Sequence, residues 1–143
     1  MDYLKVLVEE IHSVVVATVD ETGHPHTAVM DMMWEDGKTV YFLTADFKPL
    51  YKRLKEDGRV ALTGMTQGAG TMDRKSISLT GQVEWIGKEH LEELLEANPY
   101  MYEIYPTEEG RSHLQVFRFK KALGDFYDLT QLPPYQARFK IEG

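Results

Sequence analysis

The sequence predicts a mainly β (α+β) fold, in which six antiparallel strands curl into a barrel with a few short helices beside it. Short runs rich in β-branched and aromatic residues recur along the chain and are separated by turn residues. Two separations, "DETGHP" (20–25) and "EDGK" (35–38), contain the glycine of a tight turn. Helical periodicity is confined to three short stretches. Strands joined by hairpins favour an antiparallel sheet, and closure into a barrel removes its exposed edges.

Length and composition indicate one ordered domain over residues 1–143. Of the 143 residues, 43% are hydrophobic and 27% are charged. A chain of this size is long enough for one compact core and short for two. The sequence has no internal repeat and no low-complexity linker that would divide it.

Charge and residue usage exclude several classes of protein. The formal net charge of -7 argues against a nucleic-acid-binding protein, because phosphate backbones select a basic surface. The absence of cysteine excludes disulfides, thiolate metal sites and cysteine nucleophiles. The first residues, "MDYLKVLVEEIH", lack the pattern of a signal peptide, and no apolar run is long enough to cross a membrane. We therefore expect a soluble cytoplasmic protein.

The first third of the chain reads as a helix followed by a meander of three strands. Apolar residues of 3–11 fall on one helical stripe. The run "SVVVATV" (13–19) predicts the first strand, and "HTAVMDMMW" (26–34) predicts the second. The Asp36-Gly37 turn leads into a third strand, "TVYFLT" (39–44).

The remaining chain supplies two more helices and three strands. A helix over 47–54 precedes the strand "RVALTGMT" (59–66), and "KSISLTGQVEWI" (75–86) alternates between apolar and polar residues as a half-buried strand does. The stretch "GKEHLEELLEANP" (87–99) is the clearest helix. The sixth strand lies within 114–130, and we expect it to break or bend near Gly124.

The helix over 47–54 carries an unusual group of cations. Its apolar stripe consists of Phe47, Leu50, Tyr51 and Leu54, which leaves Lys48, Lys52, Arg53 and Lys55 outside it. Thr44 or Asp46 can cap its start, and Pro49 suits its first turn. Lys48 then stands at a helix N-terminus, where a phosphate monoester is favoured. The alternative is that all four cations form a solvated face paired with Glu56 and Asp57.

The strand over 26–34 has two largely apolar faces. His26, Ala28, Met30, Met32 and Trp34 alternate with Thr27, Val29, Asp31 and Met33. Such a strand is expected at the centre of the sheet, or between the barrel and a partner. Its methionines can line a flat aromatic ligand or simply fill the core.

Other candidate sites are weaker. His24 and His26 point the same way on a strand, with His12 near them in sequence, but no Asp, Glu or His pattern completes a metal site, so we predict none. No serine lies on a G-x-S-x-G elbow, which argues against a serine hydrolase. The glycine-containing loop "GAGTMD" (68–73) leads into a strand, unlike a dinucleotide-binding loop.

Taken together, the stretches "VVVATVDETGHPHTAVMDMMWEDGKTVYFLTADFKPLYKRLKEDGRVALTG" (14–64) and "KSISLTGQV" (75–83) resemble the FMN-binding split-barrel family, whose best-known members are the pyridoxamine 5'-phosphate oxidases. The similarity extends to "LEANPYMYEIY" (95–105) and "LGDFYDLT" (123–130). It looks closest to the small subgroup that includes nitroimidazole-resistance-like and general-stress-like proteins. The resemblance implies a six-stranded split β-barrel over 1–143 that forms a homodimer, with FMN in two clefts at the subunit interface.

The resemblance also implies which residues hold the cofactor. The flavin-contacting strand falls on residues 28–33, a strand-end pair on 43–44, the phosphate-binding lysine on residue 48, and a polar residue before the strand glycine on residue 76. Many members carry an arginine near residues 26–28 that this chain lacks, and Lys52 or His26 is the expected substitute. The predicted cofactor-binding residues are Ala28, Val29, Met30, Asp31, Met33, Leu43, Thr44, Lys48, Lys52 and Ser76.

Three functions remain open on the sequence. The first is an FMN-dependent oxidoreductase that takes electrons from a nicotinamide or another small reduced donor, with no assigned catalytic side chain. It is not expected to be a true pyridoxamine 5'-phosphate oxidase, since the chain lacks that enzyme's C-terminal tryptophan and "RLHD"-type segment and ends "PPYQARFKIEG". The second is a non-catalytic flavin- or haem-binding module, linked to stress. The third is a structural dimer whose ancestral site has decayed.

Overall fold

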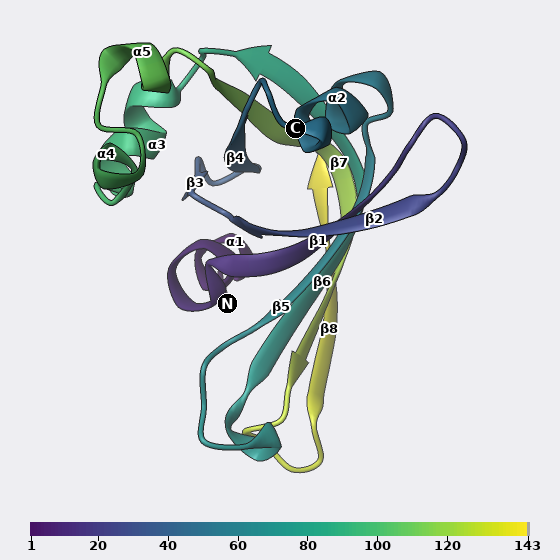
Figure 1. Cartoon of the computed structure of the whole chain (residues 1–143). Coiled ribbons are helices and arrows are strands. Elements are labelled where there is room, and N and C mark those ends of the chain that lie inside the picture. The colour runs from purple at the N-terminus through teal and green to yellow at the C-terminus, as the bar shows by residue number, and fades with distance from the viewer. Residues whose placement is uncertain (143) are drawn as a thin grey trace.

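The chain folds into one antiparallel sheet with short helices around it. A computed structural model describes residues 1–142. The strands are β1 (Ser13–Val19), β2 (Pro25–Asp31), β3 (Trp34–Glu35), β4 (Val40–Ala45), β5 (Arg59–Met65), β6 (Lys75–Gly87), β7 (Leu114–Asp128) and β8 (Tyr135–Glu142). Their order in the sheet is β2-β1-β5-β6-β7-β4-β3, and β8 pairs with β7. Figure 1 shows the sheet curled into an incomplete barrel, which confirms the predicted fold class.

Most helices lie at one end of the curled sheet. The α-helices are α1 (Tyr3–Lys5), α2 (Pro49–Glu56), α3 (Leu91–Ala97), α4 (Met101–Ile104) and α5 (Glu108–Arg111), with a π-helical turn η1 (Val6–Ile11) and a 3-10 turn η2 (Thr71–Asp73). In Figure 1, α3, α4 and α5 stand together beside β3 and β4, and α2 lies over the same end. The connections of β5 to β6 and of β7 to β8 lie at the opposite end.

Over residues 1–142 the structure has eight strands, where the sequence predicted six. The predicted strand over 26–34 ends as β2 at Asp31, and Trp34–Glu35 forms the separate strand β3, which pairs with β4. The second addition is β8, which pairs with β7 along its whole length. The alternation of Tyr135, Ala137, Phe139 and Ile141 with polar residues is the signal in the sequence that identifies this strand.

The strand expected at the centre of the sheet lies at its edge. Within residues 1–142, β2 pairs with β1 alone. Val29 is 73% exposed, whereas Met30, which points to the other face, is buried. A central position in the sheet therefore does not explain the apolar character of both faces.

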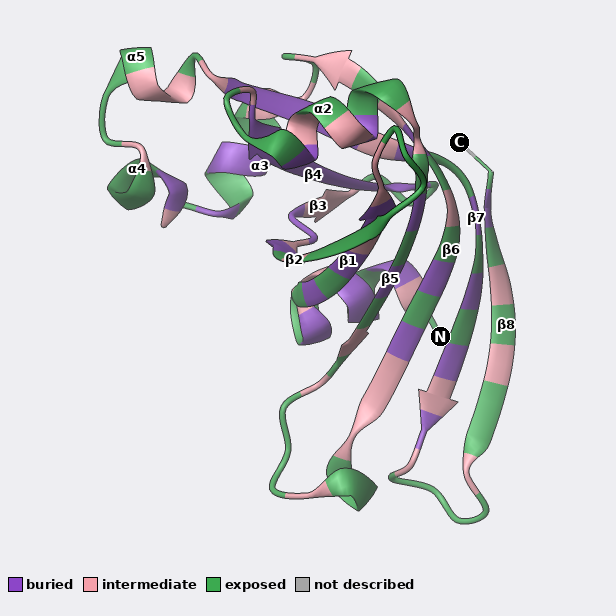
Figure 2. Ribbon diagram, turned by 45° about the vertical axis from the view of Figure 1, so that its right-hand side comes forward, coloured by how far each residue is buried: buried purple, intermediate pink, exposed green. Residues whose placement is uncertain are grey.

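The buried side chains form two clusters that meet near β4. The larger fills the concave side of the sheet and includes Leu7, Phe42, Ile77 and Phe126. The smaller joins β4 and β7 to the helices α3 and α4. Buried residues alternate with more exposed ones along the middle of β6 and the second half of β7, as Figure 2 shows, whereas the first half of β7 is buried almost throughout.

Strands β6 and β7 pass each other very closely. A Cβ atom on Gly81 would lie 2.1 Å from the carbonyl oxygen of Lys121, so only glycine fits there. Of the break or bend expected near Gly124, the break is wrong, because β7 runs through this residue as one strand. A Cβ atom on Gly124 would instead meet the ring of Phe139 at 2.3 Å, so this glycine makes room for an aromatic side chain of β8.

Among residues 1–142, the structure has no helix with the length and apolar composition needed to span a bilayer.

Candidate functional site

A cleft of about 460 Å³ opens where the two buried clusters meet. Its walls come from β2, β4, the start of α2, and the segment of α4. Most of the residues predicted from the sequence to bind a cofactor line this one cleft: Ala28, Val29, Met30, Asp31, Met33, Leu43, Thr44 and Lys48. Side chains from three separate parts of the sequence are thus brought together, and the volume is in the usual range for small-molecule sites.

The free edge of β2 forms one wall of the cleft. The lining includes four consecutive residues, 28–31, although neighbouring side chains of a strand point to opposite faces. What such residues share is the backbone edge, and here it is the edge that β1 does not occupy. An unpaired strand edge presents N–H and C=O groups, which can bind the polar edge of a planar ligand.

The start of α2 forms a second wall, and its N-terminal end is open. Lys48 is the N-cap residue with an extended backbone, Pro49 follows at the first helical position, and no side chain among residues 1–142 caps the helix. The predicted cap by Asp46 is wrong, since its carboxylate accepts a hydrogen bond from His113 at 2.8 Å instead. Thr44 does not cap the helix either and is buried in β4.

Phe47 does not belong to the buried stripe of α2. The helix begins at Pro49, and the Phe47 side chain is 65% exposed. Leu50 and Leu54 are buried as predicted. Tyr51 packs edge-on against Trp85 of β6 and Phe117 of β7.

Arg53, rather than Lys52, is the second cation of the cleft. Arg53 lines the cleft and donates a hydrogen bond from Nε to the buried hydroxyl of Thr18 at 2.9 Å. Lys52 points away and lies 4.0 Å from Glu56 on the exposed side of the helix. The expected substitute for the missing strand arginine is thus Arg53 in this cleft, and Lys52 and His26 lie outside it.

Ser76 lies outside the cleft of its own chain. It sits near the start of β6, paired with Met65 and Tyr127. Figure 1 shows that this end of β6 is at the lower end of the sheet, whereas α2 is at the upper end. Within residues 1–142, Ser76 therefore does not meet the residues that surround Lys48.

The third wall is apolar and was not assigned from the sequence. Met101, Ile104 and Tyr105 face the cleft from α4 and the residue after it. Their spacing of three and one is the signal for a shared helical face, but α4 is only four residues long, which makes the pattern weak.

One end of the cleft carries a hydrogen-bonded group of polar side chains. Asp31 accepts hydrogen bonds from Ser13 and Tyr100, each at 2.6 Å. His12 Nε2 lies 2.8 Å from the Tyr100 hydroxyl. Burial disfavours ionisation of Asp31, but the hydrogen bonds from Ser13 and Tyr100 and the nearby His12 outweigh it and lower its pKa. Burial and the bond to Asp31 raise the pKa of Tyr100.

The histidines considered as metal ligands are used elsewhere. His26 Nε2 lies 2.8 Å from Asp20 Oδ2, and His24 Nδ1 lies 2.6 Å from the Thr22 hydroxyl, both in the turn between β1 and β2. His12 lies with Tyr100 instead. Residues 1–142 contain no group of three or more His, Asp or Glu side chains placed to hold a metal ion.

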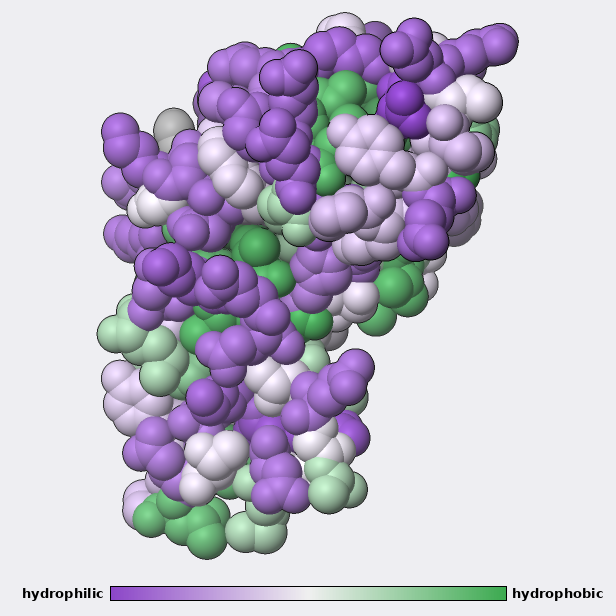
Figure 3. Space-filling view, turned by 90° about the vertical axis from the view of Figure 1, so that its left-hand side faces the viewer, coloured by the Kyte–Doolittle hydropathy of each residue, from purple (hydrophilic) through white to green (hydrophobic). Residues whose placement is uncertain are grey.

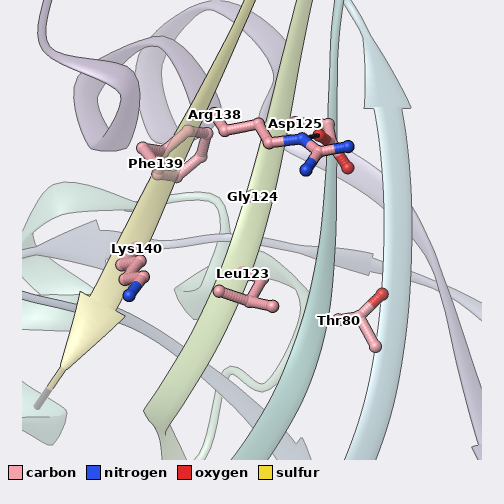
Figure 4. Close-up of a pocket in the computed structure, with 7 residues that line it drawn as sticks. All are labelled: Thr80, Leu123, Gly124, Asp125, Arg138, Phe139 and Lys140. Carbon is pink, nitrogen blue, oxygen red and sulfur yellow. Dashed lines mark ion pairs between the residues drawn. The ribbon is translucent and has the colours of Figure 1, made fainter.

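A second hollow lies along β6, β7 and β8, away from this cleft. Figure 4 shows Leu123, Gly124 and Phe139 in it, with an ion pair between Arg138 and Asp125. That pair is 3.3 Å long and both side chains are largely exposed, so it contributes little binding energy. The hollow offers a ligand no buried polar group in the described part of the chain.

The comparisons with known proteins agree with this architecture. Residues 2–126 match the family model described as pyridoxamine 5'-phosphate oxidase. Among curated protein sequences, none matches the chain. Similar solved structures include a NimC/NimA family protein from Clostridium acetobutylicum, with 23% identity, a TM-score of 0.74, and coverage of 97% of this chain and 87% of that one.

Two further structures share the fold at lower identity. A haem-binding protein from Mycobacterium smegmatis is 13% identical, with a TM-score of 0.71 over 95% of this chain and 56% of that one. An FAD-binding protein from Mesorhizobium loti is 16% identical, with a TM-score of 0.65 over 84% and 88%. The family model covers most of the sequence, so the chain belongs to the pyridoxamine 5'-phosphate oxidase family.

Proposed function

We propose that the cleft binds FMN and that the protein is an FMN-dependent oxidoreductase, which takes electrons from a reduced nicotinamide or another small reduced donor. The observation that carries this proposal is the pairing of two features in one cleft. Lys48 and Arg53 provide cations at the open start of α2, and the free edge of β2 provides backbone polar groups. FMN has a phosphate at one end and a flat ring with a polar edge at the other.

Lys48 and Arg53 are suited to hold the phosphate. A lysine ammonium group and an arginine guanidinium form charge-assisted hydrogen bonds to phosphate, and the helix dipole adds to the attraction. Arg53 then supplies from α2 the guanidinium that many relatives carry on the strand. The Thr18 hydroxyl keeps the Arg53 side chain in this orientation.

The strand edge and the apolar wall suit the flavin ring. Backbone N–H groups of β2 would meet the ring's polar edge, while Met33, Leu43 and Met101 contact its faces and exclude water. When bound, the flavin supplies the redox chemistry. Lys52 and Ser76, which lie outside this cleft, take part only if a second subunit approaches it.

We also propose that the protein is a homodimer with the cofactor at the subunit interface. The convex side of the sheet carries an uncharged outer patch of Val15, Ala17, Val29, Ala61 and Thr63, adjacent through strand pairing. Val15 is 43% exposed and Val29 is 73% exposed. A patch of this kind favours an interface, and Val29 also lines the cleft, so a partner seated there would reach the cofactor.

Not every exposed apolar residue supports the dimer. Figure 3 shows apolar residues in separate patches on the side of the molecule that carries α3 to α5, with one patch at the lower end. Met72 and Leu132 are exposed in the loops at that end. These residues lie far from the cleft, whereas the outer patch borders it.

The absorption spectrum of the purified protein tests the proposal first. We expect a flavin spectrum, either as isolated or after addition of FMN, and bleaching of that spectrum when NADH or NADPH is added without oxygen. A protein that takes up no FMN contradicts the proposal. A protein that binds FMN but is bleached by neither donor is a flavin carrier rather than an oxidoreductase.

A haem-binding module is the second candidate, because a structure of similar fold is described as a haem-binding protein. The cleft contains Met30, Met33 and Tyr105, which are residue types that can ligate haem iron. The two cations at the start of α2 favour FMN over haem. Haem added to the protein would give an intense Soret band without flavin fluorescence, which separates the two candidates.

A further inference from the structure

His12, Tyr100 and Asp31 form a continuous chain of hydrogen bonds that reaches the cleft. The hydroxyl of Tyr100 lies 2.6 Å from Asp31 Oδ2 and 2.8 Å from His12 Nε2. The other ring nitrogen of His12, Nδ1, lies 3.0 Å from the carbonyl oxygen of Val8. Ser13 donates to the second carboxylate oxygen of Asp31 at 2.6 Å. His12 directly follows η1, Tyr100 directly precedes α4, and Asp31 is the last residue of β2.

The hydrogen-bond geometry implies that these three side chains together hold one proton more than an ionised Asp31, a neutral Tyr100 and a neutral His12 would hold. A carbonyl oxygen only accepts, so His12 Nδ1 carries a proton. Tyr100 has one hydroxyl proton, yet its oxygen makes short contacts to both His12 Nε2 and Asp31 Oδ2. If Tyr100 donates to Asp31, Nε2 must carry a proton and donate to Tyr100. The reverse arrangement, in which Tyr100 donates to His12, would require a protonated Asp31, and the lowered pKa of Asp31 disfavours it.

The two ends of the chain differ in their surroundings. Asp31 lines the cleft, and its side chain is 25% exposed. His12 lies outside the set of residues that line the cleft, and its side chain is 29% exposed, so it can exchange protons with water. The raised pKa of Tyr100, caused by burial and the bond to Asp31, keeps it a neutral phenol that can pass a proton on.

Backbone contacts hold His12 in place within this row of hydrogen-bonded side chains. The carbonyl oxygen of His12 accepts a hydrogen bond from the N–H of Met32 at 2.7 Å, which ties His12 to the end of β2. His12 has a φ of 62°, an uncommon value for a non-glycine residue. Among residues 1–142, the titratable side chains in hydrogen-bond or ion-pair contact with His12 are Tyr100 and Asp31, and those in contact with Asp31 are Tyr100 and His12.

We propose that His12, Tyr100 and Asp31 form a proton relay that supplies the cleft with the proton that a two-electron reduction requires. Asp31 is the catalytic residue, and Tyr100 and His12 are positioning residues that act through it. This proposal rests on the proposed function, because it needs a redox reaction in the cleft.

The reaction balances as follows for an organic electron acceptor. Two-electron reduction of the acceptor consumes two protons, and the hydride equivalent that a nicotinamide donor supplies contains two electrons and one of those protons. The second proton reaches the acceptor through Asp31: Tyr100 gives its hydroxyl proton to Asp31 Oδ2 as it receives the Nε2 proton of His12. The carboxyl group so formed passes its proton to the acceptor and becomes a carboxylate again, and His12 regains a proton from water.

The first test needs no cofactor. Nitrogen NMR of ¹⁵N-histidine-labelled protein, with His12 assigned by the His12→Asn variant, reports which ring nitrogens carry protons. At neutral pH we expect both ring nitrogens of His12 to carry protons in the wild type, beside an ionised Asp31 carboxylate seen in its ¹³C signal. A His12 ring with one bare nitrogen beside an ionised Asp31 at that pH overturns the relay.

The second test compares two tyrosines that lie two residues apart. Tyr100→Phe removes the hydroxyl of the relay, and Tyr102→Phe removes one that is 44% exposed and outside the relay. With FMN-loaded protein, NADH and 1,4-benzoquinone, we expect Tyr100→Phe to lower kcat by about 10²- to 10⁴-fold, the usual contribution of proton transfer, with KM and FMN affinity unchanged. Equal kcat for both variants overturns the relay.

The two proposals fail in distinguishable ways. If the wild type binds no FMN, or transfers no electrons, the proposed function fails and the NMR measurement still decides whether the relay holds its extra proton. If turnover is normal in Tyr100→Phe and Asp31→Asn, the oxidoreductase stands and the relay fails.

Discussion

Lys48 is placed for anion binding by its backbone as much as by its charge. It lies at the cleft with an extended conformation just before Pro49, and the helix that follows has no side-chain cap among the described residues. The first-turn N–H groups of α2 and the Lys48 ammonium group can therefore act on the same anion.

Replacing Lys48 with alanine should weaken FMN binding. The loss of one charge-assisted hydrogen bond costs about 1.5–3 kcal/mol, which corresponds to a dissociation constant about ten- to a hundredfold higher. Fluorescence titration with FMN measures this. Lys55→Ala is the matched control, since Lys55 belongs to the same helix but lies outside the cleft, with its ammonium group over the ring of Trp85. Equal affinities for the two variants would show that the phosphate lies elsewhere.

Asp20 organises the turn between β1 and β2 through its carboxylate. Oδ1 accepts hydrogen bonds from the hydroxyl and the N–H of Thr22 and from the N–H of His24, and Oδ2 lies 2.8 Å from His26 Nε2. The bond from the Thr22 hydroxyl, followed by those from His26 and His24, lowers the pKa of Asp20. The turn sets where β2, and hence its free edge, begins.

Asp20→Asn should make the protein less stable at neutral pH and flatten the acid side of its stability profile. A carboxyl group whose pKa is lower in the folded chain stabilises the fold above the unfolded pKa of about 4, and that stabilisation is lost as the pH falls through the folded value. Urea unfolding at a series of pH values between 6 and about 2 measures the difference. Glu21→Gln, an exposed residue of the same turn, should leave the profile unchanged.

Strands β6 and β7 depend on a glycine at their closest approach. At Gly81 a Cβ atom would lie 2.1 Å from a carbonyl oxygen and 2.6 Å from the Cα of Ala122. Both contacts are to backbone, which cannot rotate away as a side chain can. The register of the two strands shifts between Gln82 and Val83, directly after this position. The glycine and the shift together let the strands curl around the core.

Gly81→Ala should therefore destabilise the fold by about 1–3 kcal/mol or more, the usual cost of forcing extra atoms into a packed site. The free energy of unfolding from urea titration measures the effect. Gly70→Ala is the control, because φ there is -157° and no atom lies within 4 Å of the added Cβ. A fall in stability that is no larger for Gly81→Ala than for Gly70→Ala would contradict the role assigned to the close approach.

The outer patch makes the assembly of the protein testable without touching the cleft. Val15 lies at the centre of that patch, between Val29 of β2 and Thr63 of β5, and it does not line the cleft. If two subunits meet here, a charge at this position would be buried without a partner, which is strongly unfavourable.

Val15→Glu should convert a dimer into a monomer and weaken FMN binding at the same time, since the second subunit completes the site. Sedimentation equilibrium measures the first effect and fluorescence titration the second. Met72→Glu, at an exposed loop position far from the patch, should change neither. A wild-type protein that is monomeric at high concentration would rule out the interface.

The local parts of the fold and of the cleft could be predicted because their signals lie within a few residues. Gly23 and Gly37 both have positive φ values in the turns that their sequences indicate. The spacing of Leu50 and Leu54 predicts the buried face of α2, and the alternation in 75–86 predicts β6. Periodicity indicates where strands occur but not which strands are neighbours in the sheet. The grouping of the cleft residues was therefore predicted from the resemblance to a known family.

The errors arose where distant segments decide the outcome. The sequence pattern of β2 indicates an apolar strand, but only the pairing of all eight strands makes it an edge. Arg53 reaches the cleft because Thr18, 35 positions away in β1, accepts a hydrogen bond from its side chain. The relay joins His12 to Tyr100, which is 88 positions away.

The sequence alone therefore specified the antiparallel class, the turns, the main helices and a cation at the start of α2, because turn chemistry and hydrophobic period act over neighbouring residues. The tertiary structure decided the strand order, the free edge of β2, the choice of Arg53 over Lys52 and the contact of His12 with Tyr100. These features depend on how the sheet curls and which faces pack together. Packing between distant segments stabilises the fold and the lost chain entropy opposes it, and both depend on the complete chain rather than on any single segment.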